Sequence, residues 1–139
     1  MSRFAFHYPF KYQEHVILFI LRCIGGGLML HLHGWKKWED YASKASNFPD
    51  PLGVGSEYSL ALTVFAEVVC SAALILGLFT RWSAFICMFT MGVAAFIVHQ
   101  DDPMKVQEKA LLYFAIYGAL TTFGPGALSI DNLRKRNAS

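Results

Sequence analysis

Ionisable residues in or beside apolar stretches are the positions where this sequence could carry chemistry. Glu67 lies within one such stretch, and His33, His99 and Glu108 lie at the rims of three others. A charge in lipid is costly, so such residues usually have a partner or a function. Histidine titrates near neutral pH, and a buried carboxyl group can hold a proton there. Together the four side chains could relay protons, hydrogen-bond a quinone carbonyl or, through the two histidines, ligate haem or copper.

Each of these residues also has a structural interpretation. Glu67 could form an ion pair with Arg22 and hold two helices together. His33 and His99 suit helix ends at the membrane interface, and Glu108 suits the positive N-terminal end of a helix. Other candidates for structural pairing are Arg81 and Asp131.

Other recognisable site motifs are missing from the sequence. It contains no HExxH, P-loop, GxGxxG or CxxCH pattern, so it predicts no metal site of a known type and no nucleotide site. Cys23, Cys70 and Cys87 all lie within apolar stretches and form no CxxC pair. We expect these thiols to pack as small apolar side chains.

Apolar stretches of membrane-spanning length must position these residues. The 139 residues are 55% hydrophobic and only 16% charged, which is too apolar for an ordinary small soluble domain. A helix needs about 20 largely apolar residues to cross a bilayer. The sequence therefore predicts an all-α integral membrane four-helix bundle, one domain over residues 1–139. The predicted spans are 16–35, 57–79, 81–99 and 107–123.

The connections between these spans predict their arrangement. The second and third spans are joined by a tight turn and the third and fourth by a short loop, so neighbouring helices should be antiparallel. Residues 36–56 form a longer loop with Pro49, Pro51, Gly53 and Gly55, which could fold over the helix ends as a lid. The first fourteen residues mix aromatic and basic side chains and are expected to lie on the membrane surface.

Four spans place both termini on the same side of the membrane. Basic residues near the span ends are almost evenly divided between the two sides, and their distribution favours cytoplasmic termini. The terminal side has Arg3, Lys11, Arg81, Arg134, Lys135 and Arg136, and the other side has Lys36, Lys37, Lys44, Lys105 and Lys109. The second group of lysines is expected to be solvated or near lipid headgroups.

Helical phase predicts which side chains face the bundle interior, because successive residues advance about 100° around the axis. His31 points away from the face of its span that carries His33. The predicted inner faces are Arg22, Gly26, Met29 and His33; Thr63, Glu67, Cys70 and Ser71; Met91 or Gly92, Ala95 and His99; and Glu108, Leu112, Ala115, Ala119 and Thr122.

The order of these features resembles the DoxX family of small four-helix bacterial membrane proteins over about residues 15–133. The matching elements are His33-Gly34 with Lys36-Lys37, Glu67, the turn at residues 74–81, Met91 with His99, Glu108, Gly124-Pro125-Gly126 and Ser129-Ile130-Asp131. The resemblance implies a redox setting, since relatives include a thiosulfate:quinone oxidoreductase subunit and proteins linked to oxidative-stress complexes. It does not imply one reaction, so enzymatic activity stays open.

These observations lead to three functional hypotheses for a multi-pass protein of the bacterial inner membrane. The first is a redox-associated subunit that binds a quinone-like lipid in a polar pocket of His33, Glu67, His99 and Glu108. The second is a non-catalytic scaffold or assembly subunit that binds other membrane or periplasmic proteins. The third is a haem or copper site that uses His33 and His99. In each case the lipid bilayer is a partner and nucleic acid is not.

Overall fold

Helices make up all the regular structure in the part of the chain that is described. The computed structural model describes residues 12–138, and no strand occurs among them. The predicted all-α class is therefore confirmed for this range. The surface segment predicted for the first fourteen residues lies almost entirely outside the described residues, as do Arg3 and Lys11.

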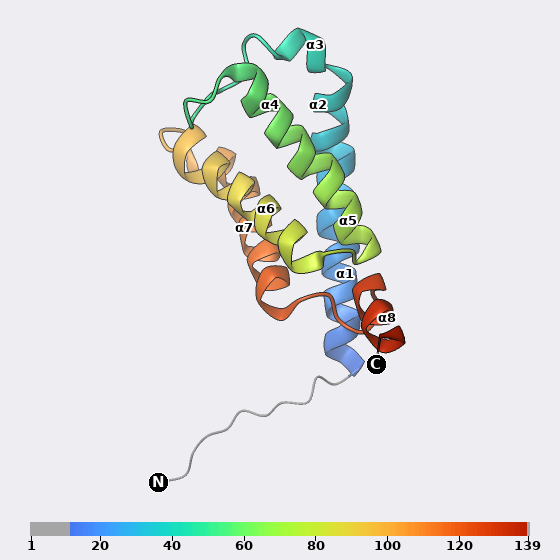
Figure 1. The fold of residues 1–139 in the computed structure, drawn as a ribbon. Helices are drawn as coiled ribbons and strands as arrows, with labels where there is room; N and C mark the ends of the chain where they lie inside the picture. The colour runs from blue at the N-terminus through green and yellow to red at the C-terminus, as the bar shows by residue number, and fades with distance from the viewer. Residues whose placement is uncertain (1–11, 139) are drawn as a thin grey trace.

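Long helical segments run side by side through the molecule (Figure 1). Several of them contain a π-helical turn, labelled η. The first segment is α1 (Tyr12–Leu28), η1 (Met29–Gly34) and α2 (Trp35–Glu39); the second is α4 (Ser56–Val64), η2 (Phe65–Cys70) and α5 (Ser71–Leu76); the third is α6 (Thr80–Val93) and η3 (Ala94–Val98); the fourth is α7 (Met104–Phe123). Two shorter helices are α3 (Tyr41–Lys44) and α8 (Ile130–Asn137).

Three of the described segments are long and apolar enough to cross a membrane, namely residues 12–39, 56–76 and 80–98. They coincide with the first three predicted spans to within a few residues at their ends. α7 contains the fourth predicted span, but Lys105, Glu108 and Lys109 lie in its first turns. α7 as a fourth membrane pass therefore stays a prediction.

The second helical segment ends at Gly77 rather than at residue 79, where the sequence placed its end. Gly77 adopts a left-handed conformation with φ of 71°. The N–H of Leu78 donates to the carbonyl of Ala73 at 2.8 Å, and the N–H of Gly77 donates to that of Leu74 at 3.1 Å. This pair of bonds is a Schellman motif, which closes a helix C-terminus. The turn makes α5 and α6 antiparallel neighbours.

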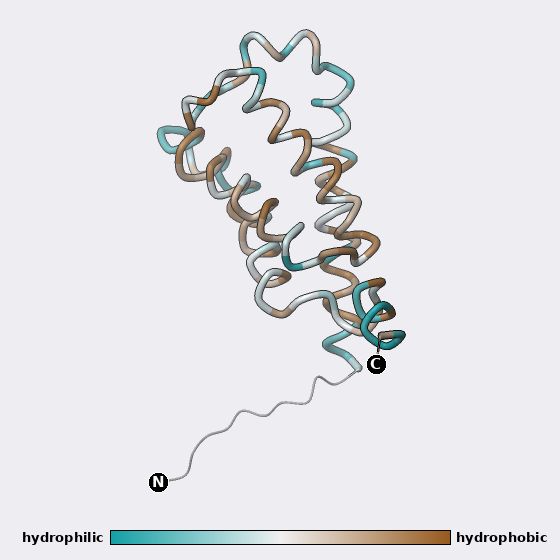
Figure 2. Tube along the Cα trace, in the orientation of Figure 1, coloured by the Kyte–Doolittle hydropathy of each residue, from teal (hydrophilic) through white to brown (hydrophobic). Residues whose placement is uncertain are grey.

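The helices pack around one apolar core. The most extensive pairing is between α6 and α7, and α1 packs on both α5 and α7. Hydrophobic residues cover the helical segments, while polar residues gather in the connections and at α8 (Figure 2). The two ends of the described chain lie at the same end of the bundle, because the N–H of Ala127 donates to Nδ1 of His15 at 3.1 Å. Buried core residues include Leu18, Met29, Leu74, Ala84, Cys87, Ala95, Tyr117 and Leu120.

Helical phase predicted the inner faces of the first three spans but not that of the fourth. Arg22, Met29, Glu67 and Met91 are all buried as expected, and His31 is exposed as expected. On α7, however, Glu108, Leu112 and Ala115 are exposed, so the predicted stripe faces outward. The inner face is formed by Ala110, Tyr117 and Leu120 instead. The larger side chains bury more apolar surface than the stripe of small ones, and Tyr117 Oη also donates to the carbonyl of Gly25 at 3.1 Å.

The guanidinium of Arg22 joins three parts of the chain inside the bundle. Arg22 is fully buried. Its Nη1 donates to the carbonyl of Leu74 at 3.1 Å and also contacts that of Ile75, while Nη2 donates to the carbonyl of Leu128. The first two carbonyls belong to the last turn of α5, and that of Leu74 also accepts from the N–H of Gly77, so Arg22 adds a charged donor there. Arg22 therefore ties α1 to the end of α5 and to the segment after α7.

The predicted ion pair between Arg22 and Glu67 is wrong. Glu67 lies two helical turns before Leu74, about 10 Å away along the helix axis. Arg22 is level with the end of α5, and the partner of Glu67 is Lys37. The backbone carbonyls at the helix end are nearer acceptors for the guanidinium.

Asp131 and Arg81 also bind backbone groups at helix ends. The carboxylate of Asp131 accepts from the N–H groups of Phe79 and Thr80 at 2.9 and 2.8 Å, which caps the N-terminus of α6. Nη1 of Arg81 donates to the carbonyls of Thr121 and Thr122 at 2.9 and 2.7 Å, in the last turns of α7. These contacts fix the segment after α7 against the turn between α5 and α6.

We expect the substitution Arg22→Met to destabilise the protein by about 2–3 kcal/mol, because the buried carbonyls of Leu74 and Leu128 lose a charged donor. The measurement is the thermal unfolding midpoint of the purified protein in mild detergent. Arg134→Met is the matched control, since Arg134 is an exposed arginine on α8. An Arg22→Met protein that unfolds at the wild-type temperature would contradict this role.

Candidate functional site

Three of the four candidate residues lie at π-helical turns in three neighbouring segments. His33 belongs to η1, Glu67 belongs to η2, and His99 directly follows η3. A π-helical turn holds one more residue than an α-helical turn and often occurs at functional sites, since it changes the direction of the side chains that follow. These turns therefore set where the polar side chains of the three segments point.

A close backbone contact brings η1 and η2 together at Gly34. A Cβ atom added to Gly34 would lie 2.7 Å from the carbonyl oxygen of Glu67, so only glycine fits there. The contact places the next turn, with Lys37, directly beside the Glu67 side chain. Nζ of Lys37 lies 2.7 Å from Oε2 of Glu67.

The Lys37–Glu67 ion pair is largely removed from solvent. The side chain of Glu67 is 5% exposed and that of Lys37 is 22% exposed. Sequence reasoning missed Lys37 because it grouped the residue with Lys36 and Lys44 as solvated. The spacing of Lys37 could have identified it as a site residue. Lys37 follows His33 by four residues and therefore shares the inner face of the first helical segment.

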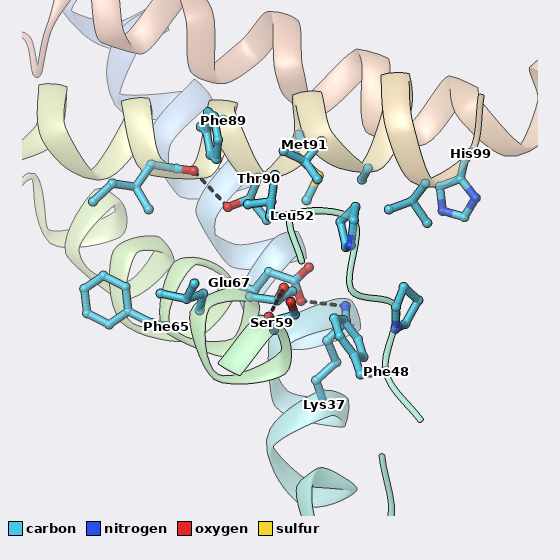
Figure 3. Close-up of a pocket in the computed structure, with 18 residues that line it drawn as sticks. Lys37, Phe48, Leu52, Ser59, Phe65, Glu67, Phe89, Thr90, Met91 and His99 are labelled. Carbon is cyan, nitrogen blue, oxygen red and sulfur yellow. Dashed lines mark hydrogen bonds and ion pairs between the residues drawn. The ribbon is translucent and has the colours of Figure 1, made fainter. Parts of the chain in front are cut away.

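A cavity of about 510 Å³ adjoins this ion pair. It lies between the segment of α4 and η2 and the segment of α6 and η3, and the loop at residues 48–52 covers one end (Figure 3). Most of its wall is apolar. The lining residues are Lys37, Phe48, Pro49, Pro51, Leu52, Ser59, Leu62, Thr63, Phe65, Glu67, Ile86, Phe89, Thr90, Met91, Val93, Ala94, Val98 and His99.

Asp50 holds the covering loop in place, as a lid over the helix ends. Its Oδ1 accepts from the hydroxyl of Ser59 at 2.8 Å and from the N–H of Val54 at 3.0 Å. Its Oδ2 accepts from the N–H of Gly55 at 2.7 Å. The Ser59 hydroxyl, and then the backbone donors, hold the pKa of the Asp50 carboxyl below its usual value of 3.8.

Only two of the four predicted pocket residues line this cavity. Glu67 lies beside Lys37, and His99 lies at the end nearer the loops, where its Nδ1 is 2.6 Å from Oδ2 of Asp102. The ring of His33 instead packs edge-on against Tyr113 at 5.8 Å between centroids.

Glu108 lies outside the cavity, because it is on the exposed face of α7. The four predicted pocket residues therefore do not line one cavity. The prediction treated the face of α7 that carries Glu108 as an inner face, whereas this face is exposed.

The cavity combines apolar walls with one charge-balanced polar site. An ammonium group offers three N–H donors and a carboxylate offers only acceptors, so the ion pair can both donate to a ligand and accept from it. Among the described residues there is no group of three or more His, Cys, Asp or Glu side chains that could hold a metal ion. His33 and His99 have separate neighbours in Tyr113 and Asp102. The chemistry available here is hydrogen bonding and proton exchange beside an apolar chamber.

Comparison with known proteins identifies the family. The DoxX family model matches residues 17–100. Two uncharacterized proteins of Haemophilus influenzae are similar. One is 30% identical over 129 residues, covering 88% of this chain and 92% of the relative, and the other is 28% identical over 111 residues, covering 74% of each. No solved structure matches. The match to the family model and the similarity along most of both chains confirm the resemblance seen in the sequence, and the chain belongs to the DoxX family.

Proposed function

We propose that this protein is a four-pass protein of the bacterial inner membrane that binds a quinone-type lipid in the cavity between α4 and α6. The observation that carries the proposal is the buried Lys37–Glu67 ion pair in the wall of an otherwise apolar cavity. In this proposal α7 is the fourth pass and both termini are cytoplasmic. The protein serves as a redox-associated subunit, and a membrane or periplasmic partner exchanges electrons with the quinone.

The position of the cavity favours entry from the lipid. Leu62, Phe65 and Phe89 line the cavity and are also 57%, 47% and 53% exposed on the outside of the bundle. They belong to helical segments of membrane-spanning length. A molecule dissolved in the hydrocarbon layer would therefore meet an apolar opening, whereas a water-soluble ligand would have to cross the lid.

The ion pair suits the headgroup of a quinone in both of its redox states. A quinone carbonyl accepts hydrogen bonds, which the Lys37 ammonium group can donate. A hydroquinone hydroxyl donates a hydrogen bond, which the Glu67 carboxylate can accept. No hydrogen bond to Oε1 of Glu67 from the described residues is present, which leaves this oxygen for a ligand.

The size of the cavity is compatible with this ligand. Sites for small molecules typically measure about 300–1,000 Å³ and are mostly apolar with few polar groups. The volume of about 510 Å³ lies inside this range. It would hold a quinone ring and the first part of its tail, and the rest of the tail would extend through the opening into the lipid.

A specific observation also favours the scaffold hypothesis. Leu112 and Ala115 are exposed on the outer face of α7, and Ala119 lies in the same stripe. Small residues in a membrane helix allow close packing of another helix. This face could therefore bind a partner subunit, with or without a ligand in the cavity.

Substitution of either member of the ion pair should weaken quinone binding. We expect Lys37→Met and Glu67→Gln to raise the Kd for a short-chain quinone at least about tenfold, which corresponds to about 1.4 kcal/mol. Binding is measured on purified protein in detergent by equilibrium dialysis. The matched controls are Lys44→Met, a lysine paired with Asp40 at the surface, and Glu57→Gln, an exposed glutamate. Unchanged affinity in both variants, with thermal unfolding like that of the wild type, would refute the site.

Loosening the lid should speed ligand release. We expect Asp50→Asn to raise the dissociation rate constant of the quinone several-fold, because an amide oxygen cannot replace both carboxylate oxygens. The ionised carboxylate of Asp50 accepts these hydrogen bonds. Their stabilisation of the lid is therefore fully present above the ordinary pKa of an aspartate carboxyl and is lost as the pH falls through the lowered pKa of Asp50. Release from the wild type should then be constant between about pH 5 and 8. Asp101→Asn, in the exposed loop before α7, is the control. Identical release rates in both variants would show that Asp50 does not hold a lid.

The scaffold hypothesis predicts that the outer face of α7 holds a partner. Ala115→Trp should remove a co-purifying membrane protein from mild-detergent extracts while leaving quinone affinity unchanged, because the indole blocks close helix packing. Ala42→Trp, on the exposed helix α3, provides the comparison. A wild-type protein that purifies alone and monodisperse from its native membrane would count against a stable partner.

A further inference from the structure

Two buried thiols lie near residues that line the cavity, although neither thiol lines it. Cys70 ends η2 and is 3% exposed, and Cys87 lies in α6 and is 2% exposed. Cys70 follows the lining residue Glu67 by three positions, and Cys87 precedes the lining residue Met91 by four. Cys87 is therefore one helical turn from Met91 and on the same face of α6, while Cys70 lies at the end of the π-helical turn that carries Glu67.

The hairpin places both cysteines at the same depth. Cys70 lies seven residues before Gly77, and Cys87 lies eight residues after Phe79, at the two ends of the turn. Each residue of a helix advances about 1.5 Å along the axis. In two antiparallel helices the cysteines are therefore level with one another, about 10–12 Å from the turn.

Small residues allow the two helices to approach closely around the thiols. Ala66 and Ala84 are 1% and 0% exposed. Sγ of Cys87 donates to the carbonyl of Ala66 at 3.3 Å, so this side chain reaches the backbone of η2 one turn before Cys70. Both cysteines belong to the same cluster of packed core residues.

A polar group without a partner lies in the same cluster. The hydroxyl of Ser71, next to Cys70, is fully buried and has no hydrogen bond. An unsatisfied buried polar group costs about 1–3 kcal/mol, so an acceptor that forms beside this hydroxyl would be stabilised by it. The hydroxyl could donate to a thiolate that forms beside it.

We propose that Cys70 and Cys87 are a redox-active dithiol that closes to a disulfide by reducing a quinone bound in the cavity. The inference rests on the proposed function for its oxidant. Each thiol loses its hydrogen and one Sγ–Sγ bond forms, so the protein gives up two electrons and two protons. The quinone accepts both electrons and both protons and becomes the hydroquinone. The cysteines then bring redox chemistry to the cavity from the protein itself.

The test uses the full-length protein, reduced, purified in mild detergent and mixed with one equivalent of a short-chain benzoquinone without oxygen. Free thiols are then alkylated, and the intact mass and the peptides are measured. We expect the wild type to lose two hydrogen atoms, to give a peptide with Cys70 joined to Cys87, and to form one equivalent of hydroquinone. Cys23, a half-buried cysteine on α1, should be alkylated.

Variants assign the reaction to this pair. Cys70→Ser and Cys87→Ser should each form no hydroquinone, while Cys23→Ser should react as the wild type does. Because serine brings a hydroxyl into the core, Cys70→Ala and Cys87→Ala, which add no polar group, are tested beside the serine variants, and the thermal unfolding midpoint of each shows that the bundle is folded. Hydroquinone formation by Cys70→Ser or Cys87→Ser at the wild-type level would overturn the proposal.

Quinone binding, measured separately, distinguishes the two proposals. If the wild type binds the quinone but all three cysteines are alkylated, the dithiol is overturned and the cavity stands. If the wild type binds no quinone, the proposed function is refuted. The formation of a disulfide by the dithiol is then tested separately with the thiol oxidant diamide. A bond between Cys70 and Cys87 after diamide then supports the pair, and three free thiols overturn it.

Discussion

A guanidinium buried in an apolar helix bundle must find its hydrogen-bond acceptors within the protein, and Arg22 finds them on backbone carbonyls. Those carbonyls lie at the end of α5 and at Leu128 in the segment after α7. One side chain therefore gives a charged donor to two parts of the chain that are far apart in sequence. The same segment after α7 carries α8 and Asp131, whose carboxylate caps α6.

A second buried charge, nearer the other end of the bundle, is paired with an opposite charge rather than with backbone carbonyls. There a carboxylate, Glu67, is buried with an ammonium group, Lys37, as its partner. Around Arg22 the helices pack tightly, whereas beside the ion pair α4 and α6 enclose a cavity of about 510 Å³. Buried ion pairs contribute little net stability when the cost of desolvation is included. The proposed function gives this charged pair a role in binding, beside its role as the partner set for two buried charges.

The sequence was sufficient for the helices and for most of their inner faces, because hydrophobic periodicity is a strong signal. It was insufficient where the signal was polar. Glu108 was predicted to face inward because its stripe is rich in small residues suited to close packing, but Ala110, Tyr117 and Leu120 form the buried face of α7 instead. Lys37 was missed because a cluster of lysines usually lies in solvent. The contact of Gly34 with Glu67, and the π-helical turns on both sides of it, depend on tertiary packing and have no sequence signature.

The charge balance of the ion pair also limits what can bind beside it. Lys37 and Glu67 together are neutral when both are ionised, so an ionic ligand in this apolar cavity would bring an uncompensated charge. A neutral molecule with a carbonyl or hydroxyl group can instead add hydrogen bonds to the pair without breaking it. Its apolar remainder would lie along Leu62, Phe65 and Phe89 toward the lipid. In the proposed function the site would therefore select against ions and for neutral amphipathic lipids, a class that includes the quinones.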